Sequence, residues 1–386
     1  MKTLLITILV FISFGLAHEA HGAALIDYSE DVTISLKAGV ASLSTTTAHT
    51  YDLTRTTLFF LGWQANTTAG NIDDAIANFE CMTDPDSVTL SRSDLGTAGT
   101  TTASARIVEW ASGVTTSVQC YTINTFPRGI GYFPVTLSPA VVASSTIATW
   151  TGVNSTSTVG AGNIDRVMGK CSTGDSTTGY LHKGGDSLRN ATTTCYFTEF
   201  ASGIFDSIQQ VEVTVGGNGV LTADVTISSV TLNDTSIIFC GYRPNSGTGA
   251  SGFLIQSELI DATTIRGTRL GHISTGRLCV NAVDWNSSYL AQNAQRGEII
   301  MNAGVSTQLN SVTSVDRTKS LLSMGGWMGT STQASFMIGF EMLTNDAIHS
   351  FRLNSAATAT TTWSRTVRAL ILASMRGISS RSASRK

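Results

Sequence analysis

Only 13% of the 386 residues are charged and the formal net charge is −3, so the chain has no long basic face that could neutralise the phosphates of a nucleic acid. The sequence holds 5 prolines and 36 glycines and is rich in Thr and Ser, a composition that favours sheets over helices.

The first 22 residues have the three parts of a secretory signal peptide. Lys2 supplies the positive charge, residues 3–16 are apolar, and residues 20–22 form a small-residue cleavage site. A membrane anchor is the alternative, but this segment is shorter than the roughly 20 residues that span a bilayer. We therefore expect residues 1–22 to be removed. The mature chain, from Ala23, should be secreted and extracellular or at the cell surface, with no membrane span.

One β pattern of about 85–90 residues then recurs four times along the chain. Each copy has a first strand, an apolar run that ends at a glycine, and a last strand whose end is marked by Trp110, Phe200, Trp285 and Leu372 in turn. The glycine-ended runs are 58–62, 147–152, 237–241 and 321–326. The predicted copies cover 31–115, 117–204, 207–290 and 297–375, and a basic tail covers 376–386.

Each copy should contain about six short antiparallel strands. As one flat sheet these strands would leave an apolar face in water, whereas two sheets packed face to face bury it. The sequence therefore predicts an all-β protein of four tandem antiparallel β-sandwich repeats, with essentially no long helix. The links between copies are very short, which favours a semi-rigid array.

Six cysteines in a secreted chain predict three disulfides. Nearest-neighbour pairing gives Cys81–Cys120, Cys171–Cys195 and Cys240–Cys279, one of 15 pairings that six cysteines allow. The first would join copy one to copy two, and the others would lie within their copies. No C-x-x-C motif or Cys/His cluster predicts a metal site, and no motif predicts a cofactor.

Several residue patterns are candidates for sites of chemistry. His182 and His349 share a place in the fifth strand, where a surface role is expected. Acidic and basic residues on the fourth and fifth strands would form weak cross-strand surface pairs; they are Glu80, Glu258, Glu341 and Arg92, Arg266, Arg352. No pair of carboxylates is singled out as a glycosidase would need, so we expect no enzyme.

Four tryptophans recur at core-like positions, which favours packing over sugar stacking; they are Trp63 with Trp327 and Trp110 with Trp285. Acidic loops at 71–74, 84–86 and 163–165 could offer oxygen ligands to calcium, but local Asx turns explain them better. Five Asn-x-Ser/Thr sequons matter only in a host that glycosylates them; they are Asn66, Asn154, Asn190, Asn233 and Asn286.

The segment 132–139, followed by a glycine-ended strand and a final strand ending in Phe or Trp, resembles the six-stranded sandwich of H-type lectins. The copies also resemble tandem β-sandwich repeats of bacterial surface proteins and phage fibres. The resemblance implies the fold of each copy and matches no sugar-contacting residue.

Two functions follow as hypotheses. The first is a secreted, non-catalytic structural subunit that associates with itself into an extracellular fibre, sheath or surface layer. The alternative is a multivalent lectin or adhesin for surface glycans, in which four weak sites gain avidity.

Overall fold

The computed structural model describes part of the chain: residues 25–66, 76–92, 99–126, 131–155, 168–183, 191–217, 219–243, 254–270, 275–290, 292–329, 338–352 and 359–367. The predicted signal peptide, the basic tail and the fourth strand-end landmark at Leu372 lie outside these residues.

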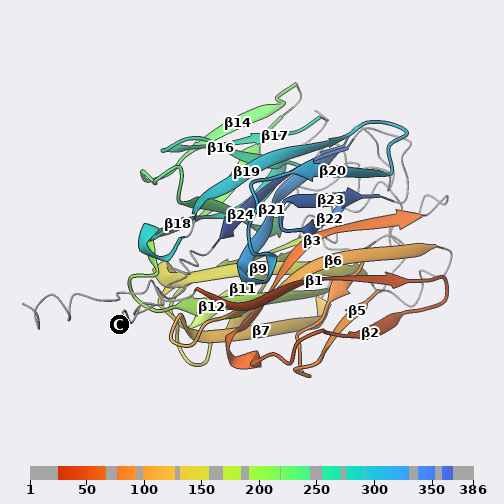
Figure 1. The fold of residues 1–386 in the computed structure, drawn as a ribbon, viewed down its shortest axis with the longest axis horizontal. Coiled ribbons are helices and arrows are strands. Elements are labelled where there is room, and N and C mark those ends of the chain that lie inside the picture. The colour runs from red at the N-terminus through yellow and green to blue at the C-terminus, as the bar shows by residue number, and fades with distance from the viewer. Residues whose placement is uncertain are drawn as a thin grey trace, which may run out of the picture.

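The strands fall into four sets, which we call units 1 to 4 (Figure 1). Unit 1 contains β1 (Ile26–Leu36), β2 (Ser42–Thr46), β3 (Thr56–Asn66), β4 (Asn78–Phe79), β5 (Ser87–Ser91) and β6 (Thr100–Trp110). Unit 2 contains β7 (Thr115–Phe126), β8 (Tyr132–Thr136), β9 (Thr146–Ser155), β10 (Gly169–Thr173), β11 (Thr178–Lys183) and β12 (Ala191–Phe200).

Unit 3 contains β13 (Phe205–Val215), β14 (Thr222–Thr226), β15 (Thr235–Tyr242), β16 (Gln256–Asp261), β17 (Thr264–Thr268) and β18 (Gly276–Trp285). Unit 4 contains β19 (Gln292–Met301), β20 (Thr307–Ser311), β21 (Ser320–Gly329), β22 (Gly339–Thr344), β23 (Ala347–Phe351) and β24 (Ala359–Val367). Helical structure in the described ranges is limited to the short turns η1 (Leu53–Arg55), η2 (Ala143–Ser145), η5 (Ser287–Tyr289) and η6 (Arg317–Lys319).

Strand pairing follows one scheme in every unit. The first, sixth and third strands pair in that order, and so do the second, fifth and fourth, as β1-β6-β3 and β2-β5-β4 show in unit 1. The third strands of units 2, 3 and 4 also pair with the fourth strand of the unit before, which produces six-stranded sheets such as β2-β5-β4-β9-β12-β7. The all-β prediction is confirmed, and the sheets form a propeller-like ring. Four separate sandwiches are not confirmed, because the sheets are shared between units.

The ring closes where unit 4 meets unit 1. β22 packs against β3, and a Cβ added to Gly62 in β3 would lie less than 3.0 Å from the carbonyl oxygen of Ile338. Figure 1 shows β20, β23, β22, β3, β6 and β1 in succession, so these two three-stranded sheets lie edge to edge in the strand order of the six-stranded sheets. The first and last parts of the chain therefore lie side by side.

The recurrent glycines lie within the third strands, each of which continues past its glycine, by a single residue at Gly241, so the expectation that they end the apolar strands was wrong. Each sits at a bulge with φ between +104° and +122°, a region open mainly to glycine. Each also faces a fourth-strand carbonyl of the preceding unit at a spacing that leaves no room for a Cβ. The glycines and the residues that supply these carbonyls are Gly62 and Ile338, Gly152 and Ala77, Gly241 and Gly169, and Gly326 and Ile255.

The core follows from this arrangement. The four third strands contact one another in a circle, and their aromatic side chains meet inside it, with ring centroids 5.4 Å apart for Trp63 and Trp150 and 5.8 Å apart for Trp63 and Trp327. A second buried cluster contains Trp110 and Trp285. The prediction that the recurrent tryptophans pack in the core is confirmed.

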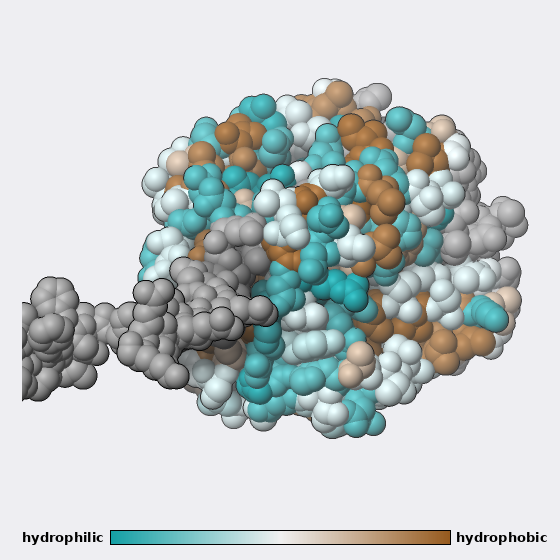
Figure 2. Space-filling view, viewed as in Figure 1, coloured by the Kyte–Doolittle hydropathy of each residue, from teal (hydrophilic) through white to brown (hydrophobic). Residues whose placement is uncertain are grey.

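The two kinds of sheet edge differ in cover. The long first strands contact the loop before the third strand of the preceding unit, as β1 does with η6 and β7 with η1. The short second strands carry exposed apolar side chains, among them Leu43 (44% exposed), Tyr132 (55%) and Leu309 (62%). On the face drawn in Figure 2, apolar side chains form small patches separated by polar ones. The first strands therefore contact the neighbouring unit at one turn, and Ile300 of the first strand β19 is 47% exposed. The second strands carry most of the exposed apolar side chains on these two kinds of strand.

Candidate functional site

The four joints between neighbouring units are equivalent in backbone and different in side chains. Strand register gives every joint one residue equivalent to Cys81, in or just after the fourth strand, and one first-strand residue of the following unit equivalent to Cys120. From joint 1–2 to joint 4–1 the pairs are Cys81 and Cys120, Thr173 and Gln210, Leu259 and Arg296, and Met342 and Asp31.

Joint 1–2 is covalent. Cys81 and Cys120 form a disulfide with their Cα atoms 5.7 Å apart. The backbone N–H of Met82 donates to the hydroxyl of Tyr196 at 3.0 Å. Unit 1 is therefore fastened to unit 2, as nearest-neighbour pairing predicts.

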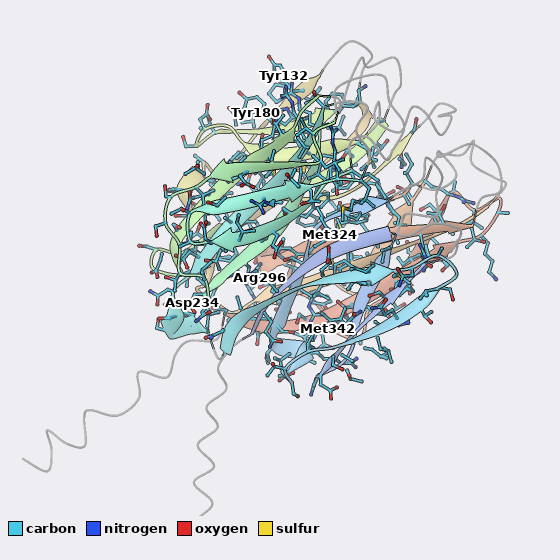
Figure 3. All side chains as sticks on the ribbon, turned by 90° about the horizontal axis from the view of Figure 1, so that it is seen from above. Tyr132, Tyr180, Asp234, Arg296, Met324 and Met342 are labelled. Atoms are coloured by element: carbon cyan, nitrogen blue, oxygen red, sulfur yellow. A yellow bond between two sulfur atoms is a disulfide. The ribbon has the colours of Figure 1, made fainter. Side chains whose placement is uncertain are left out.

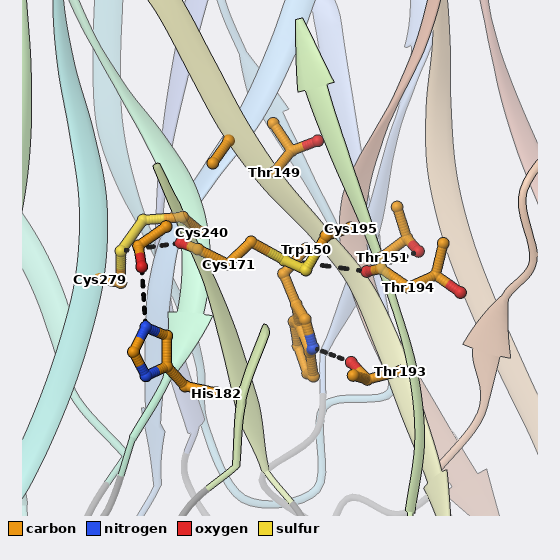
Figure 4. The surroundings of a disulfide bond; sticks show 12 residues. Thr149, Trp150, Thr151, Cys171, His182, Thr193, Thr194, Cys195, Cys240 and Cys279 are labelled. Carbon is orange, nitrogen blue, oxygen red and sulfur yellow. Dashed lines mark hydrogen bonds between the residues drawn. A yellow bond between two sulfur atoms is a disulfide. The ribbon is translucent and has the colours of Figure 1, made fainter. Parts of the chain in front are cut away.

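The other two disulfides lie within units 2 and 3 and are also the nearest-neighbour pairs. Cys171–Cys195 joins β10 to β12, two strands that belong to different sheets, and lies beside Trp150 (Figure 4). Cys240–Cys279 joins the neighbouring strands β15 and β18.

Joint 2–3 carries a partly buried ion pair. The Lys170 ammonium lies 2.5 Å from the Glu212 carboxylate. Burial raises the pKa of Glu212, but the hydrogen bond and the positive charge of Lys170 outweigh burial, so the pKa lies below its ordinary value. Asn281 adds a hydrogen bond of 2.9 Å to the carbonyl of Ala148.

Joint 3–4 is polar and less complete. Arg296 donates to the carbonyls of Leu232 and Thr235 at 2.6 Å each. Gln256 donates to Glu298 at 2.6 Å, while its carbonyl oxygen is buried with no hydrogen-bond partner. A cleft of about 140 Å³ lies between β16 and β19.

Joint 4–1 is held by a polar group that we call the latch: Ser29, Asp31 and Arg106 of unit 1 with Arg317, Ser320 and Met342 of unit 4. Arg106, which is 1% exposed, donates to Asp31 at 2.6 Å and to the carbonyl of Ser320 at 2.8 Å. It also donates to the carbonyl of Arg317. The second oxygen of Asp31 accepts from the N–H of Met342 at 2.5 Å.

Burial raises the pKa of Asp31, and this effect exceeds the opposing effect of the Arg106 charge. Beside the latch lies a cleft of about 280 Å³ that Tyr28, Glu30 and Glu341 help to line. Its charged groups already have protein partners: Glu30 accepts from Tyr51 at 2.8 Å, and Glu341 bonds His349 at 3.1 Å. The cleft therefore reads as incomplete packing between units 4 and 1.

Among the described residues, unit 2 is the unit whose second and fifth strands together carry two tyrosines and a histidine, which we call the aromatic cluster: Tyr132, Tyr180 and His182. The ring centroids of Tyr132 and Tyr180 are 5.7 Å apart and nearly perpendicular, and His182 lies 5.9 Å from Tyr180. His182 bonds Ser172 through one ring nitrogen at 2.8 Å, while the other is buried with no partner. Figure 3 shows Tyr132 and Tyr180 together, far from Met342.

The predicted carboxylate–arginine surface pairs were wrong for two of the three arginines. Arg92 and Arg352 are buried and donate to backbone carbonyls of the turn between the first and second strands of their units, such as Val40 and Val305 at 2.9 and 2.7 Å. Arg266 is exposed and faces Glu258 in register, but its ion pair, at 2.7 Å, is with Asp224.

Sequence reasoning missed the real recurrence, which is a buried cation at the end of each fifth strand. The four residues are Arg92, Lys183, Arg269 and Arg352. The signal was available, since each follows the last fifth-strand residue that pairs with the second strand.

A second missed recurrence is a side-chain clamp from the first strand to the loop after the second strand. Gln209 accepts from the N–H of Ser228 at 2.6 Å and donates to its carbonyl at 3.0 Å. Gln295 makes the same pair of bonds with Thr313, and Gln119 and Glu30 hold the equivalent places.

The remaining sequence candidates are structural or lie outside the described residues. His182 and His349 both lie on fifth strands, as predicted, and Asp84 accepts from the N–H of Asp86 at 2.9 Å, which confirms an Asx turn there. The loops at 71–74 and 163–165 are among the undescribed residues. In the described ranges no three His, Cys, Asp or Glu side chains are placed to hold a metal ion.

Of the sequons, Asn154 is buried, and Asn286 accepts from the N–H of Ser288 in η5. Within the described part of the chain, no helix has the length and apolar character to cross a bilayer. The chain matches no protein-family model and no curated protein.

Proposed function

We propose that the protein is a secreted, non-catalytic structural subunit that associates with itself into an extracellular fibre, sheath or surface layer. The observation that carries this proposal is the contrast between the two kinds of sheet edge. The first strands contact a turn of the preceding unit, whereas the second strands present exposed Leu43, Tyr132 and Leu309.

Burial of apolar side chains against a second copy would stabilise such contacts by roughly 25 cal/mol per Å² of apolar surface. In this proposal the four units are copies of one β module of about 85–90 residues. The recurrent tryptophans, the buried cations and the two disulfides within units 2 and 3 make the structure rigid, because these side chains are buried.

The test is electron microscopy and light scattering of the mature chain at rising concentration. Wild-type protein should form ordered particles, and Leu309→Lys should lose them while keeping its unfolding free energy. Ser311→Lys is the matched control, since it adds the same charge to the same strand and removes no apolar side chain. Wild-type protein that stays monomeric at every concentration would refute the proposal.

A second function, binding of carbohydrate, is favoured by the aromatic cluster. Perpendicular tyrosine rings form a corner against which the C–H face of a sugar ring can stack, and His182, bonded to Ser172, packs beside Tyr180. Because the other units lack this trio, the proposal is one site and not four.

A glycan array would test this second function. Tyr132→Ala should lower the affinity for any bound sugar at least tenfold, while Tyr132→Phe, which keeps the ring, should retain it. Equal binding by wild type and Tyr132→Ala would exclude the aromatic cluster as the site.

A further inference from the structure

Unit 4 is the unit that takes part in no disulfide. No cysteine follows Cys279, so no disulfide reaches unit 4. Units 1 and 2 are joined by Cys81–Cys120, and units 2 and 3 each hold an internal disulfide. Noncovalent contacts hold both joints of unit 4, as they hold joint 2–3, and unit 4 also has no disulfide within it.

The link that leads into unit 4 is longer than the other two. Residues 111–114 and 201–204 connect the preceding units, whereas residues 286–291 connect β18 to β19 and include η5. A longer link allows a unit to leave its place without strain in the strands on either side.

Both joints of unit 4 are incompletely packed. The clefts of about 140 and 280 Å³ lie at joints 3–4 and 4–1, on either side of this unit. Within it, the indole N–H of Trp327 is buried with no partner, whereas the equivalent N–H of Trp63 donates to Ala77 at 2.7 Å.

We infer that unit 4 exchanges between copies of this chain: strands β19–β24 of one copy take the same place in the ring of a second copy, with residues 286–291 as the hinge. This inference rests on the proposed self-association: exchange of unit 4 links the chains, and contacts between second strands then order the linked chains into particles. Every contact of the closed ring reforms in the exchanged one, so only the path of the link changes.

The occupant must be a second copy because the latch is specific. Without unit 4, the guanidinium of Arg106 loses the carbonyls of Arg317 and Ser320, and Asp31 loses the N–H of Met342. A buried charge is costly unless its hydrogen bonds are restored, and unit 4 of another copy restores all of them. One-way exchange gives an open chain of molecules, and reciprocal exchange gives a dimer.

The experiment copies the natural disulfide of joint 1–2 to joint 4–1. Asp31→Cys with Met342→Cys places two cysteines at the positions equivalent to Cys120 and Cys81. Because this change removes a partner of Arg106, a second pair, Thr33→Cys with Glu341→Cys, leaves the latch intact; their side chains are 3.2 Å apart. A thiol-specific cross-linker can join the second pair.

The full mature chain of each variant is assembled natively, and also refolded at high concentration, before oxidation or cross-linking. Exchange predicts a ladder of covalent oligomers on a non-reducing gel. Thr173→Cys with Gln210→Cys at joint 2–3 is the control and should give no ladder. Oxidising the variant Asp31→Cys with Met342→Cys to its disulfide as a dilute monomer, before assembly, should abolish later assembly.

A ladder from either joint 4–1 pair but not from the joint 2–3 control supports exchange. Ordered particles from wild type, together with joint 4–1 variants that cross-link only within one chain, would overturn exchange and leave the proposed function standing. A ladder after concentrated refolding, with no ordered particles from wild type, would support exchange and refute the proposed function.

Discussion

The residue that does most to shape this protein is the third-strand glycine. It combines a positive φ with the close approach of a carbonyl from the preceding unit, and both conditions exclude a side chain. The recurrence of the glycine could be predicted from the sequence. Its reason could not, because the carbonyl comes from another unit and, for Gly62, from the opposite end of the chain.

Gly152→Ala should therefore lower the unfolding free energy by at least about 3 kcal/mol, through backbone strain and displacement of the Ala77 carbonyl. Gly113→Ala is the matched control: its φ is +80°, but nothing lies within 4 Å of the new Cβ, so about 1 kcal/mol should be lost. Denaturant titration measures both. Equal losses would mean that strain alone accounts for the effect.

His182 should make stability depend on pH. Burial, with the nearby charges of Lys170 and Arg243, lowers the pKa of His182 from 6.5 to about 3. Because the folded protein disfavours the protonated ring, the contribution of neutral His182 to the unfolding free energy is fully present above pH 6.5. It is lost as the pH falls from 6.5 towards 3.

His182→Gln removes this titration, so wild type should lose more stability than the variant on acidification through that interval. Unfolding free energies of both proteins at several pH values measure the difference. Parallel pH profiles would show that folding does not lower the pKa of His182.

At the scale of elements, the sequence predicted the strand-rich copies and the cysteine pairs, because both depend on local spacing. It did not predict the bulges or the sharing of sheets, because pairing between β4 and β9 or between β16 and β21 is decided by residues far apart. The buried cations were misread for a similar reason, since the carbonyls that they bind lie some 50 positions away in the chain, 52 for Arg92 and Val40.

Two of the disulfides offer a matched comparison, since Cys81–Cys120 and Cys240–Cys279 each close a separation of 39 residues. Chain entropy assigns about 4 kcal/mol to either loop. Replacing either pair by serine should lower the unfolding free energy by about that amount, as measured by denaturant titration. A loss below about 1 kcal/mol for either would contradict the entropic account for that bridge.

At the scale of the whole molecule, a period of four copies is compatible with an open array and with a closed ring. The short links predict a semi-rigid array but do not decide between an open array and a closed ring. What selects the ring is the fit of Gly62 to Ile338 and of Arg106 to Ser320, contacts between residues more than 200 positions apart that no local pattern encodes.

The ring should not be equally stable all round. Unit 4 has no disulfide and a cleft at each joint, so its strands should open at a lower free energy than the cross-linked strands of unit 2. Hydrogen exchange followed by mass spectrometry should therefore show faster exchange in β21 and β24 than in the equivalent β9 and β12. The disulfide of the variant Asp31→Cys with Met342→Cys should slow hydrogen exchange in unit 4 and leave that of β9 unchanged. Uniform protection would mean that the noncovalent latch holds unit 4 as firmly as the disulfides hold its neighbours.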